Sequence, residues 1–245
     1  KMKNIPQERL KLLNTGQVES RNLMEFLALD IELILKNNFP EFDYSMVDTK
    51  LGIVQKLEHI ALSVDAQFGF KKFEQFLSHK SDIIRSLACY LLANQPLSFK
   101  DKLNLMTRLA EDQNSGVREW AWLAIRPDFA KNLPKNIPHL IDFTCQSPNL
   151  RRFASELSRP RGVWCKHIVE FKEEPWLGLG IIEPMKSDES KYVQLSVGNW
   201  LNDASKSQAS WVKKLCLEWQ AKSPTNHTYN ICKRAQRTIN KIPRL

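Results

Sequence analysis

The chain has 245 residues, of which 42% are hydrophobic and 26% charged, a composition typical of a globular protein with a sizeable core. It has only 8 glycines, with no Gly-x-Gly-x-x-Gly and no Gly-Lys-Ser/Thr, which argues against dinucleotide-binding and P-loop folds. The net charge of +9 favours an anionic partner, chiefly nucleic acid. The alternative is that the excess of Lys and Arg only keeps the surface solvated.

Targeting signals and cysteine spacing bear on where the protein is found and on whether it binds a metal. The sequence shows no signal peptide and no apolar run long enough to span a bilayer, so we expect no membrane partner. The five cysteines are scattered without a Cys-x-x-Cys pair, which favours a reduced cytoplasm. Cys165 and His167 are two ligands only, too few for a closed zinc site, while Cys89 and Cys232 fit a helical core. We predict neither a metal nor a cofactor.

The first 78 residues predict an N-terminal helical cap. Residues 18–37 have an amphipathic pattern with one apolar side, which predicts a single helix. Residues 45–64 predict another helix. No stretch rich in Pro, Gly or Ser separates this cap from the later residues, so residues 1–245 are expected to form one domain.

Residues 79–245 carry an internal repeat. Small polar residues precede an aliphatic residue, usually followed by Arg, in the segments 79–92, 111–125, 146–158 and 186–201, with a fainter copy at 223–239. The aliphatic residues recur after 33, 33, 43 and 38 positions, at Ile84, Val117, Leu150, Val193 and Ile231. This period suits helix pairs of the HEAT type, in which the polar turn caps the second helix. The fold class predicted is all-α, a right-handed α-solenoid of HEAT-like repeats with a concave basic groove.

The strongest candidate site lies between residues 151 and 164. Arg152, Glu156 and Arg159 are spaced i, i+4, i+7 and share one helical face. Pro160 should end that helix, which leaves Arg161 and Trp164 in the turn and at the start of the next helix. Arginines suit phosphates, and the indole ring could stack on a base or a cation. A plain Arg–Glu pair beside a buried tryptophan is the alternative.

Two further segments add polar groups at equivalent repeat positions. In residues 117–127, Glu119, Trp122 and Arg126 follow one another by one helical turn, whereas Trp120 faces the core, and Arg126-Pro127 repeats the Arg159-Pro160 ending. In residues 198–207 the polar positions are Asn199, Asn202, Asp203 and Lys206, and Trp200 fits a packed position. Glu119 could equally be a solvated residue near a helix start.

At these residues the chain resembles the HEAT-like-repeat DNA alkylation-repair glycosylases, the AlkC/AlkD superfamily, and within it the AlkC branch. The strings that carry the resemblance are VESRNLMEFLALD (18–30), VREWAWLAIRP (117–127), RRFASELSRPRGVWCKHI (151–168), LGLGIIEPMKSDESKYVQLSVGNWLNDASKSQ (177–208) and YNICKRAQRTI (229–239). The chain resembles the shorter form, without a C-terminal immunoglobulin-like domain.

The resemblance implies a monofunctional glycosylase that excises cationic N-methylated bases, N3-methyladenine and N3-methylcytosine, from duplex DNA without full base flipping. Because such a base leaves neutral, no general acid is needed, and an ionised carboxylate stabilises the oxocarbenium ion and activates water. Glu156 is the first candidate for this role, with Glu119 and Asp203 in support. The expected DNA contacts are Arg152, Arg159, Arg161, Arg126, Lys206, Asn199 and Asn202. Trp164 and Trp122 are expected to pack against the lesion or its sugar.

Two other interpretations remain open. HEAT solenoids often act as non-catalytic scaffolds, so the chain could bind DNA or a partner protein without reacting. An RNA-binding repeat protein fits less well, because the repeats differ most at their groove positions. We expect a monomer acting on alkylated double-stranded DNA in the bacterial cytoplasm.

Overall fold

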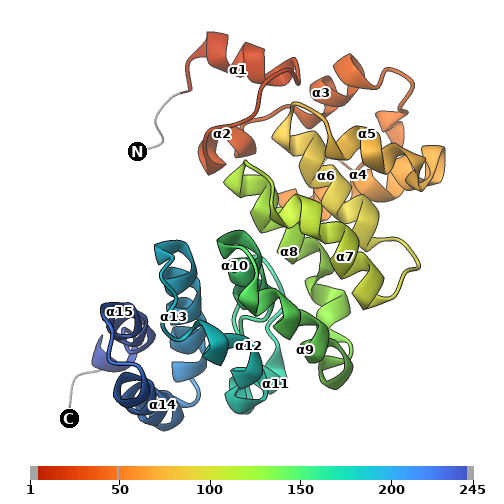
Figure 1. The fold of residues 1–245 in the computed structure, drawn as a ribbon. Helices are drawn as coiled ribbons and strands as arrows, with labels where there is room; N and C mark the ends of the chain where they lie inside the picture. The colour runs from red at the N-terminus through yellow and green to blue at the C-terminus, as the bar shows by residue number, and fades with distance from the viewer. Residues whose placement is uncertain (1–4, 49, 242–245) are drawn as a thin grey trace. The chain divides into compact units, whose positions relative to one another are not determined.

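The computed structural model describes residues 5–48 and 50–241, in which every regular element is a helix (Figure 1). The predicted all-α class is therefore confirmed. The chain divides between Ile125 and Arg126 into two compact units, and the boundary falls inside one continuous helix, α8 (Ser115–Ala130). The expected single domain, with its N-terminal cap at residues 1–78, stays a prediction. None of the described helices has the length and apolarity that a bilayer crossing requires.

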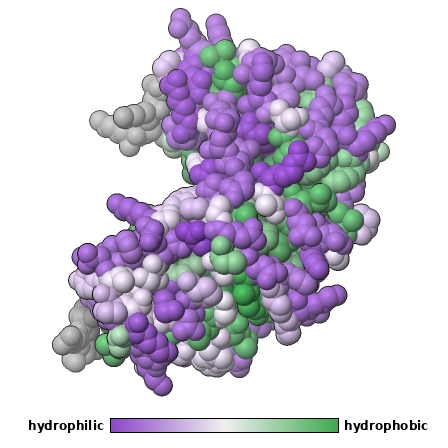
Figure 2. All heavy atoms as spheres, in the orientation of Figure 1, coloured by the Kyte–Doolittle hydropathy of each residue, from purple (hydrophilic) through white to green (hydrophobic). Residues whose placement is uncertain are grey.

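The first unit holds the helices that precede the boundary, together with the start of α8. On the face drawn in Figure 2, hydrophilic side chains cover most of its N-terminal helices. Its elements are α1 (Gln7–Asn14), α2 (Leu23–Leu27), α3 (Ile31–Asn38), η1 (Tyr44–Met46), α4 (Ile53–Phe68), η2 (Phe70–Lys72), α5 (Phe73–Leu77), α6 (Asp82–Ala93) and α7 (Phe99–Ala110).

The predicted single helix over residues 18–37 is wrong, because the segment forms two short helices. Asn22 caps α2 by accepting a hydrogen bond from the Glu25 amide, and Asp30 caps α3 by accepting one from the Leu33 amide at 3.0 Å. When an aspartate side chain accepts a hydrogen bond from a backbone amide three residues later, a new helix starts at the aspartate and the preceding helix does not continue through it. The second predicted helix, residues 45–64, begins later, after Gly52, and runs on to Phe68.

The second unit holds the rest of α8 and the elements after it. Its elements are α9 (Leu133–Ile141), η3 (Asp142–Cys145), α10 (Pro148–Leu157), α11 (Val169–Glu173), η4 (Pro175–Gly178), α12 (Leu179–Ile182), η5 (Glu183–Met185), α13 (Lys191–Ser205), α14 (Ala209–Lys222), α15 (Asn226–Ala235) and η6 (Ile239–Lys241). Within this unit α13 packs between α10 and α15, while α14 packs against both α13 and α15.

The aliphatic repeat positions occupy equivalent places in the helices. Each is fully or almost fully buried, and in four of the five repeats it is the third residue of its helix: Ile84 in α6, Val117 in α8, Leu150 in α10 and Val193 in α13. Ile231, the fainter copy, lies deeper inside α15 and is also buried. The predicted repeat register is thus a register of core positions.

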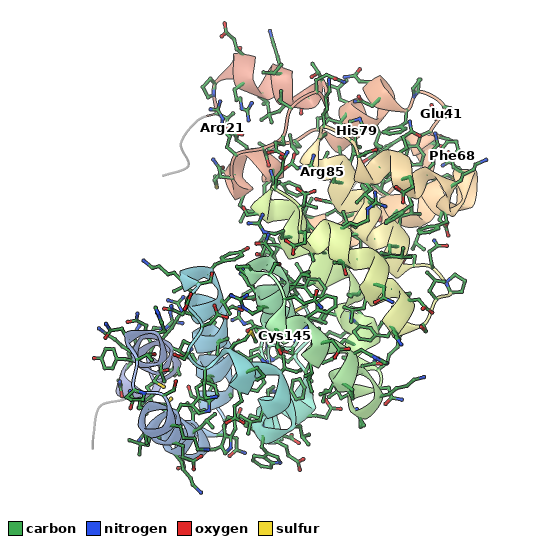
Figure 3. All side chains as sticks on the ribbon, viewed as in Figure 1. Arg21, Glu41, Phe68, His79, Arg85 and Cys145 are labelled. Atoms are coloured by element: carbon green, nitrogen blue, oxygen red, sulfur yellow. The ribbon has the colours of Figure 1, made fainter. Side chains whose placement is uncertain are left out.

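In four of the five repeats, the residue that follows the aliphatic position donates to carbonyls of the preceding polar turn. The Arg85 guanidinium donates to the backbone carbonyls of residues 79 and 80, and Arg118 donates to those of residues 112 and 113. The Gln194 amide does the same with residues 188 and 189. Arg85, labelled in Figure 3, also pairs with Asp112 of the next turn at 2.7 Å. These side chains therefore hold the polar turn against the first turn of the helix that follows it. This role explains why Arg recurs after the aliphatic position.

Candidate functional site

Glu156 lies near the end of α10, where its side chain is only 4% exposed. Its Oε1 accepts a hydrogen bond from the Ser196 hydroxyl at 2.8 Å, and its Oε2 accepts one from Arg159 Nη1 at 3.1 Å. Arg152 Nη2 lies 3.8 Å from Oε1. The predicted Arg152–Glu156–Arg159 cluster is therefore present, although α10 ends at Leu157 and Arg159 reaches back from the turn. This helix end agrees with the one expected before Pro160.

Asp203 is the second buried carboxylate and belongs to α13. Its Oδ2 accepts a hydrogen bond from Arg159 Nε at 2.9 Å and lies 2.8 Å from Arg159 Nη2, and its Oδ1 lies 3.1 Å from Lys206 Nζ. Arg159 thus bridges Glu156 and Asp203, whose elements α10 and α13 pack together. We call Glu156, Arg159 and Asp203 the bridged carboxylate pair.

Electrostatics favours the charged form of Arg159. Burial lowers the pKa of its guanidinium, but the nearby charges of Glu156 and Asp203 and the hydrogen bonds to both raise it by more, so the pKa is raised overall. Two anions around one cation leave a net charge of −1, and the adjacent cations Arg152 and Lys206 bring the total for the five groups to +1. A positive charge is therefore attracted only where it comes close to a carboxylate oxygen, while the surrounding cations attract anions.

Trp200 fixes the spacing of the two helices. Its ring is fully buried, as predicted, and its Nε1 donates to the Ser158 carbonyl at 3.0 Å and to the Ser158 hydroxyl at 3.1 Å. Gly178 lies so close that a Cβ there would meet the indole at 2.6 Å. This packing holds the end of α10 against α13, and with it the two carboxylates.

One polar face of α13 supplies two site residues that the sequence analysis missed. Tyr192, Ser196, Asn199 and Asp203 follow one another at i, i+4, i+7 and i+11, which places them on one face of the helix. Ser196 binds Glu156, and the Tyr192 ring lies under the Arg152 guanidinium at 4.3 Å. Extending the helical spacing backward from Asp203 would have identified both residues.

Arg161 and Lys206 lie at the solvent edge of the bridged carboxylate pair. Arg161 Nε donates to the Asp203 carbonyl at 3.3 Å and its Nη2 to the Ser207 hydroxyl at 2.7 Å. The Lys206 side chain is 41% exposed. Both cations therefore lie where an anionic ligand can reach them, as the prediction of phosphate contacts requires.

Trp164 lies in the loop between α10 and α11. It is not at a helix start, as the sequence suggested, because the next helix begins only at Val169. Its backbone has a φ of +62°, a left-handed conformation that a bulky residue seldom adopts, and its ring is 47% exposed. The loop backbone thus keeps a large aromatic ring partly in solvent, which fits the expected packing against a ligand.

Arg126 occupies a different environment from the one predicted. The side chain is only 2% exposed and donates to the backbone carbonyls of Leu157, Arg159 and Lys166, the first two at 2.6 Å. Burial lowers the pKa of its guanidinium. Moreover, α8 continues through Pro127 to Ala130 and does not end as expected. This environment favours a structural role, tying the loop after α10 to α8, over the expected phosphate contact.

Asn199 and Asn202 also have partners within the fold. Asn202 is buried, and its Oδ1 accepts hydrogen bonds from the Thr238 amide and hydroxyl, both at 3.0 Å. Asn199 Oδ1 accepts one from Arg234 Nε at 2.8 Å. Asn202 therefore anchors the segment after α15, which argues against the predicted DNA contact, whereas half-buried Asn199 positions an arginine.

Glu119 and Trp122 belong to the first unit. The Trp122 indole is buried and donates from Nε1 to Glu119 Oε2 at 2.9 Å. A buried ring is unsuited to the predicted packing against a lesion and instead orients the Glu119 carboxylate. Trp120 is in the core, as expected, and stacks on Phe26 with the ring centroids 5.4 Å apart.

Within residues 5–48 and 50–241, no three His, Cys, Asp or Glu side chains are grouped so that they could hold a metal ion. Burial raises the pKa of the Cys165 thiol, which disfavours the thiolate that zinc would require.

The helix pairs, the repeated turn and the buried repeat positions define a HEAT-like helical-repeat protein. Three solved structures share this fold. The alkylpurine DNA glycosylase AlkC of Pseudomonas fluorescens, bound to DNA containing an abasic site analog, matches with a TM-score of 0.67 and 22% identity over 96% of this chain and 63% of its own. AlkD2 of Streptococcus mutans matches with a TM-score of 0.65 and 24% identity over 83% of this chain and 94% of its own. The protein smu.31 of Streptococcus mutans UA159 matches with a TM-score of 0.64 and 26% identity over 75% of this chain and 92% of its own.

Sequence comparison alone is less informative. No protein-family model matches the chain. The uncharacterized protein YhaZ of Bacillus subtilis (strain 168) is 40% identical over 119 residues, which is 48% of this chain and 33% of YhaZ. The match therefore spans about a third of that relative. The solved structures confirm the AlkC/AlkD type of fold, and the AlkC branch stays a prediction.

Proposed function

We propose that this protein is a monofunctional DNA glycosylase that removes cationic N-methylated bases, such as N3-methyladenine and N3-methylcytosine, from double-stranded DNA. The observation that carries the proposal is the bridged carboxylate pair, two buried acids held by one arginine beside exposed cations. The fold shared with an AlkC bound to DNA supports the same reaction class.

The proposed chemistry follows from charge. A base methylated on its ring nitrogen leaves without needing a proton, so positive charge develops on the deoxyribose. The Glu156 carboxylate stabilises that charge, and one of its unused lone pairs orients the attacking water. Both oxygens keep such lone pairs because each has one short hydrogen bond in the structure. Asp203 supports the cluster through Arg159 and adds attraction for a cationic base.

The DNA contacts fall to the cations around the bridged carboxylate pair. Arg161, Lys206 and Arg152 bind phosphates around the lesion, contacts that position the duplex without reading its sequence. Trp164 packs against the base or its sugar. Glu119, held by Trp122, is a further candidate carboxylate, whereas Arg126 and Asn202 serve the fold.

Release of free base provides the decisive test. Wild type, Glu156→Gln and a matched surface variant, Glu218→Gln, are incubated with duplex DNA containing N3-methyladenine, and released base is quantified in single turnover. We expect wild type and Glu218→Gln to release base and Glu156→Gln to lose at least about 100-fold in rate, in line with the loss of one electrostatic group. DNA affinity should change little. Full activity of Glu156→Gln would refute the assignment of this residue.

A non-catalytic DNA-binding scaffold is the second candidate, favoured by the repeat architecture alone. It predicts DNA binding by all three proteins and no released base from any. The same experiment therefore separates the two functions, since binding and release are measured on the same duplex.

A further inference from the structure

We propose that a basic groove between α13 and α15 binds the phosphate backbone of a DNA strand next to the reacting nucleotide, which extends the proposed function and rests on it. This α13–α15 groove has a volume of about 680 Å³. Its charged and titratable lining consists of Glu189, Lys191, His227, Lys233, Arg234 and Arg237.

The positive charges that line the groove outnumber the negative ones. It contains four cationic side chains against the single carboxylate of Glu189. Within residues 5–48 and 50–241, Lys191, Lys233 and Arg237 form no ion pair, and all three are exposed. Arg85, Arg151 and Arg159, by contrast, are each paired with a carboxylate. Clustered cations in a hollow raise the local concentration of an anionic ligand.

Arg234 makes this a built site and not only a charged surface. Its aliphatic stem packs on Gly198 of α13, where a Cβ would meet Arg234 Cβ at 2.8 Å. Asn199 Oδ1 accepts from its Nε at 2.8 Å, which fixes the direction of the guanidinium. Burial and the neighbouring charges of Arg237 and Arg159 lower its pKa, so a bound anion would relieve that repulsion. Its Nη1 and Nη2 have no hydrogen-bond partner among the described residues and can donate to a phosphate.

The cations form a track, which favours an extended polyanion. Lys233 lies in the last turn of α15 and Arg237 in the turn that follows the helix, and both line the groove. Arg234 adds a third donor between them, and Lys191 faces them from the start of α13. A phosphodiester chain presents successive charges along such a line, and its oxygens suit both Arg and Lys.

The groove continues from the bridged carboxylate pair. Asn199, which holds Arg234, lies one turn before Asp203 on α13. Lys191 lies 12 residues before Asp203 on the same helix, which is about 18 Å at about 1.5 Å per residue. At about 3.4 Å per nucleotide along one strand, this length corresponds to about five base pairs. The groove therefore takes the backbone within about five base pairs of the reacting nucleotide.

A triple charge-neutral variant tests the inference. In Lys191→Gln/Lys233→Gln/Arg237→Gln the groove loses three cations, and Lys213→Gln/Lys214→Gln/Lys222→Gln removes three exposed lysines from α14 as the matched control. Affinity for an undamaged duplex is measured from 50 to 200 mM salt. Because each phosphate contact contributes about 0.9 to the salt slope, the groove variant should reduce the slope by about 2–3 and bind about tenfold or more weakly. A groove variant that binds DNA like the α14 control overturns the inference.

Rate and duplex length separate this inference from the proposed function. Base release by the groove variant should need about tenfold or more protein to reach half of its maximal rate, in line with its weaker DNA binding, whereas the α14 control should match wild type. If wild type releases no base, the glycosylase proposal fails while the binding result still stands. Two further duplexes are each shortened to about three base pairs on one side of the lesion, one duplex for each side. The groove variant should bind one of them as tightly as wild type does, because that duplex no longer reaches the groove. An equal deficit on both truncated duplexes overturns the placement of the strand.

Discussion

Arg159 joins two carboxylates that are 47 residues apart in the sequence: Nη1 lies 3.1 Å from Glu156 Oε2, and Nη2 lies 2.8 Å from Asp203 Oδ2. All three side chains are largely removed from solvent. An arginine in this position neutralises one of the two charges and fixes the direction of both acids. The three groups together carry one negative charge, and Arg152 and Lys206 lie beside it.

Removing this arginine should therefore destabilise the protein strongly. We expect Arg159→Met to lower the free energy of unfolding by about 3–5 kcal/mol, because two buried carboxylates are left without their partner. Arg108→Met is the control, since its ion pair with Glu74 is exposed on both sides and should be worth less than about 1 kcal/mol. Urea unfolding followed by circular dichroism gives both values. Equal losses in the two variants would show that the bridge contributes no special stability.

Arg126 should behave as a residue of the fold and not of the DNA interface. Arg126→Met removes the donors to three backbone carbonyls, and unsatisfied buried groups cost about 1–3 kcal/mol each. We expect a clear loss in urea midpoint with an unchanged salt slope of DNA binding in the folded fraction. A stable variant whose salt slope falls by about one would restore the phosphate contact that the sequence suggested.

The contrast between Arg159 and Arg126 shows what the sequence could establish. Helical spacing placed Arg152, Glu156 and Arg159 together correctly, because side chains within two turns share a face whatever the tertiary structure. The repeat alignment placed Arg126 and Arg159 at equivalent positions. It could not show that the loop after α10 folds over Arg126 and satisfies it with carbonyls. Burial depends on such long-range packing, which local pattern does not encode.

The pairing of Glu156 with Asp203 needed tertiary structure, whereas Ser196 did not. Whether an acid on α13 meets one on α10 depends on how Trp200 seats against Ser158, a contact between residues 42 positions apart. Ser196, in contrast, lies seven residues before Asp203 on the same helix and was within reach of the periodicity argument. The burial of Trp122 also depends on tertiary packing, because its ring turns into the core of its unit.

The left-handed backbone at Trp164 gives a prediction about strain. A tryptophan with a φ of +62° is strained by about 1–3 kcal/mol, which glycine does not experience. We expect Trp164→Gly to be more stable than Trp164→Ala by about 1 kcal/mol, measured by urea unfolding. Both variants should release N-methylated bases more slowly if the ring packs on the lesion. Greater stability of the alanine variant would mean that the loop adopts another conformation.

Asp82 should make stability depend on pH. Its carboxylate is buried and accepts from the Ser20 amide at 3.0 Å and from the Ser20 hydroxyl. Burial, the largest effect, raises its pKa despite these hydrogen bonds. A group whose pKa is higher in the folded state stabilises the protein below its unfolded pKa, about 3.9, and this contribution is lost as the pH rises through the folded pKa.

Asp82→Asn should remove that dependence, because an amide keeps an acceptor for the Ser20 amide and can donate to the Ser20 hydroxyl without carrying charge. We expect the free energy of unfolding of the variant minus that of wild type to increase from pH 4 upward and to level off above the folded pKa. Urea unfolding at half-unit pH intervals measures this difference, in which all other titrating groups cancel. A difference that stays flat, or that falls with pH, would mean that Asp82 keeps its charge at little cost and that the Ser20 hydrogen bonds outweigh its burial.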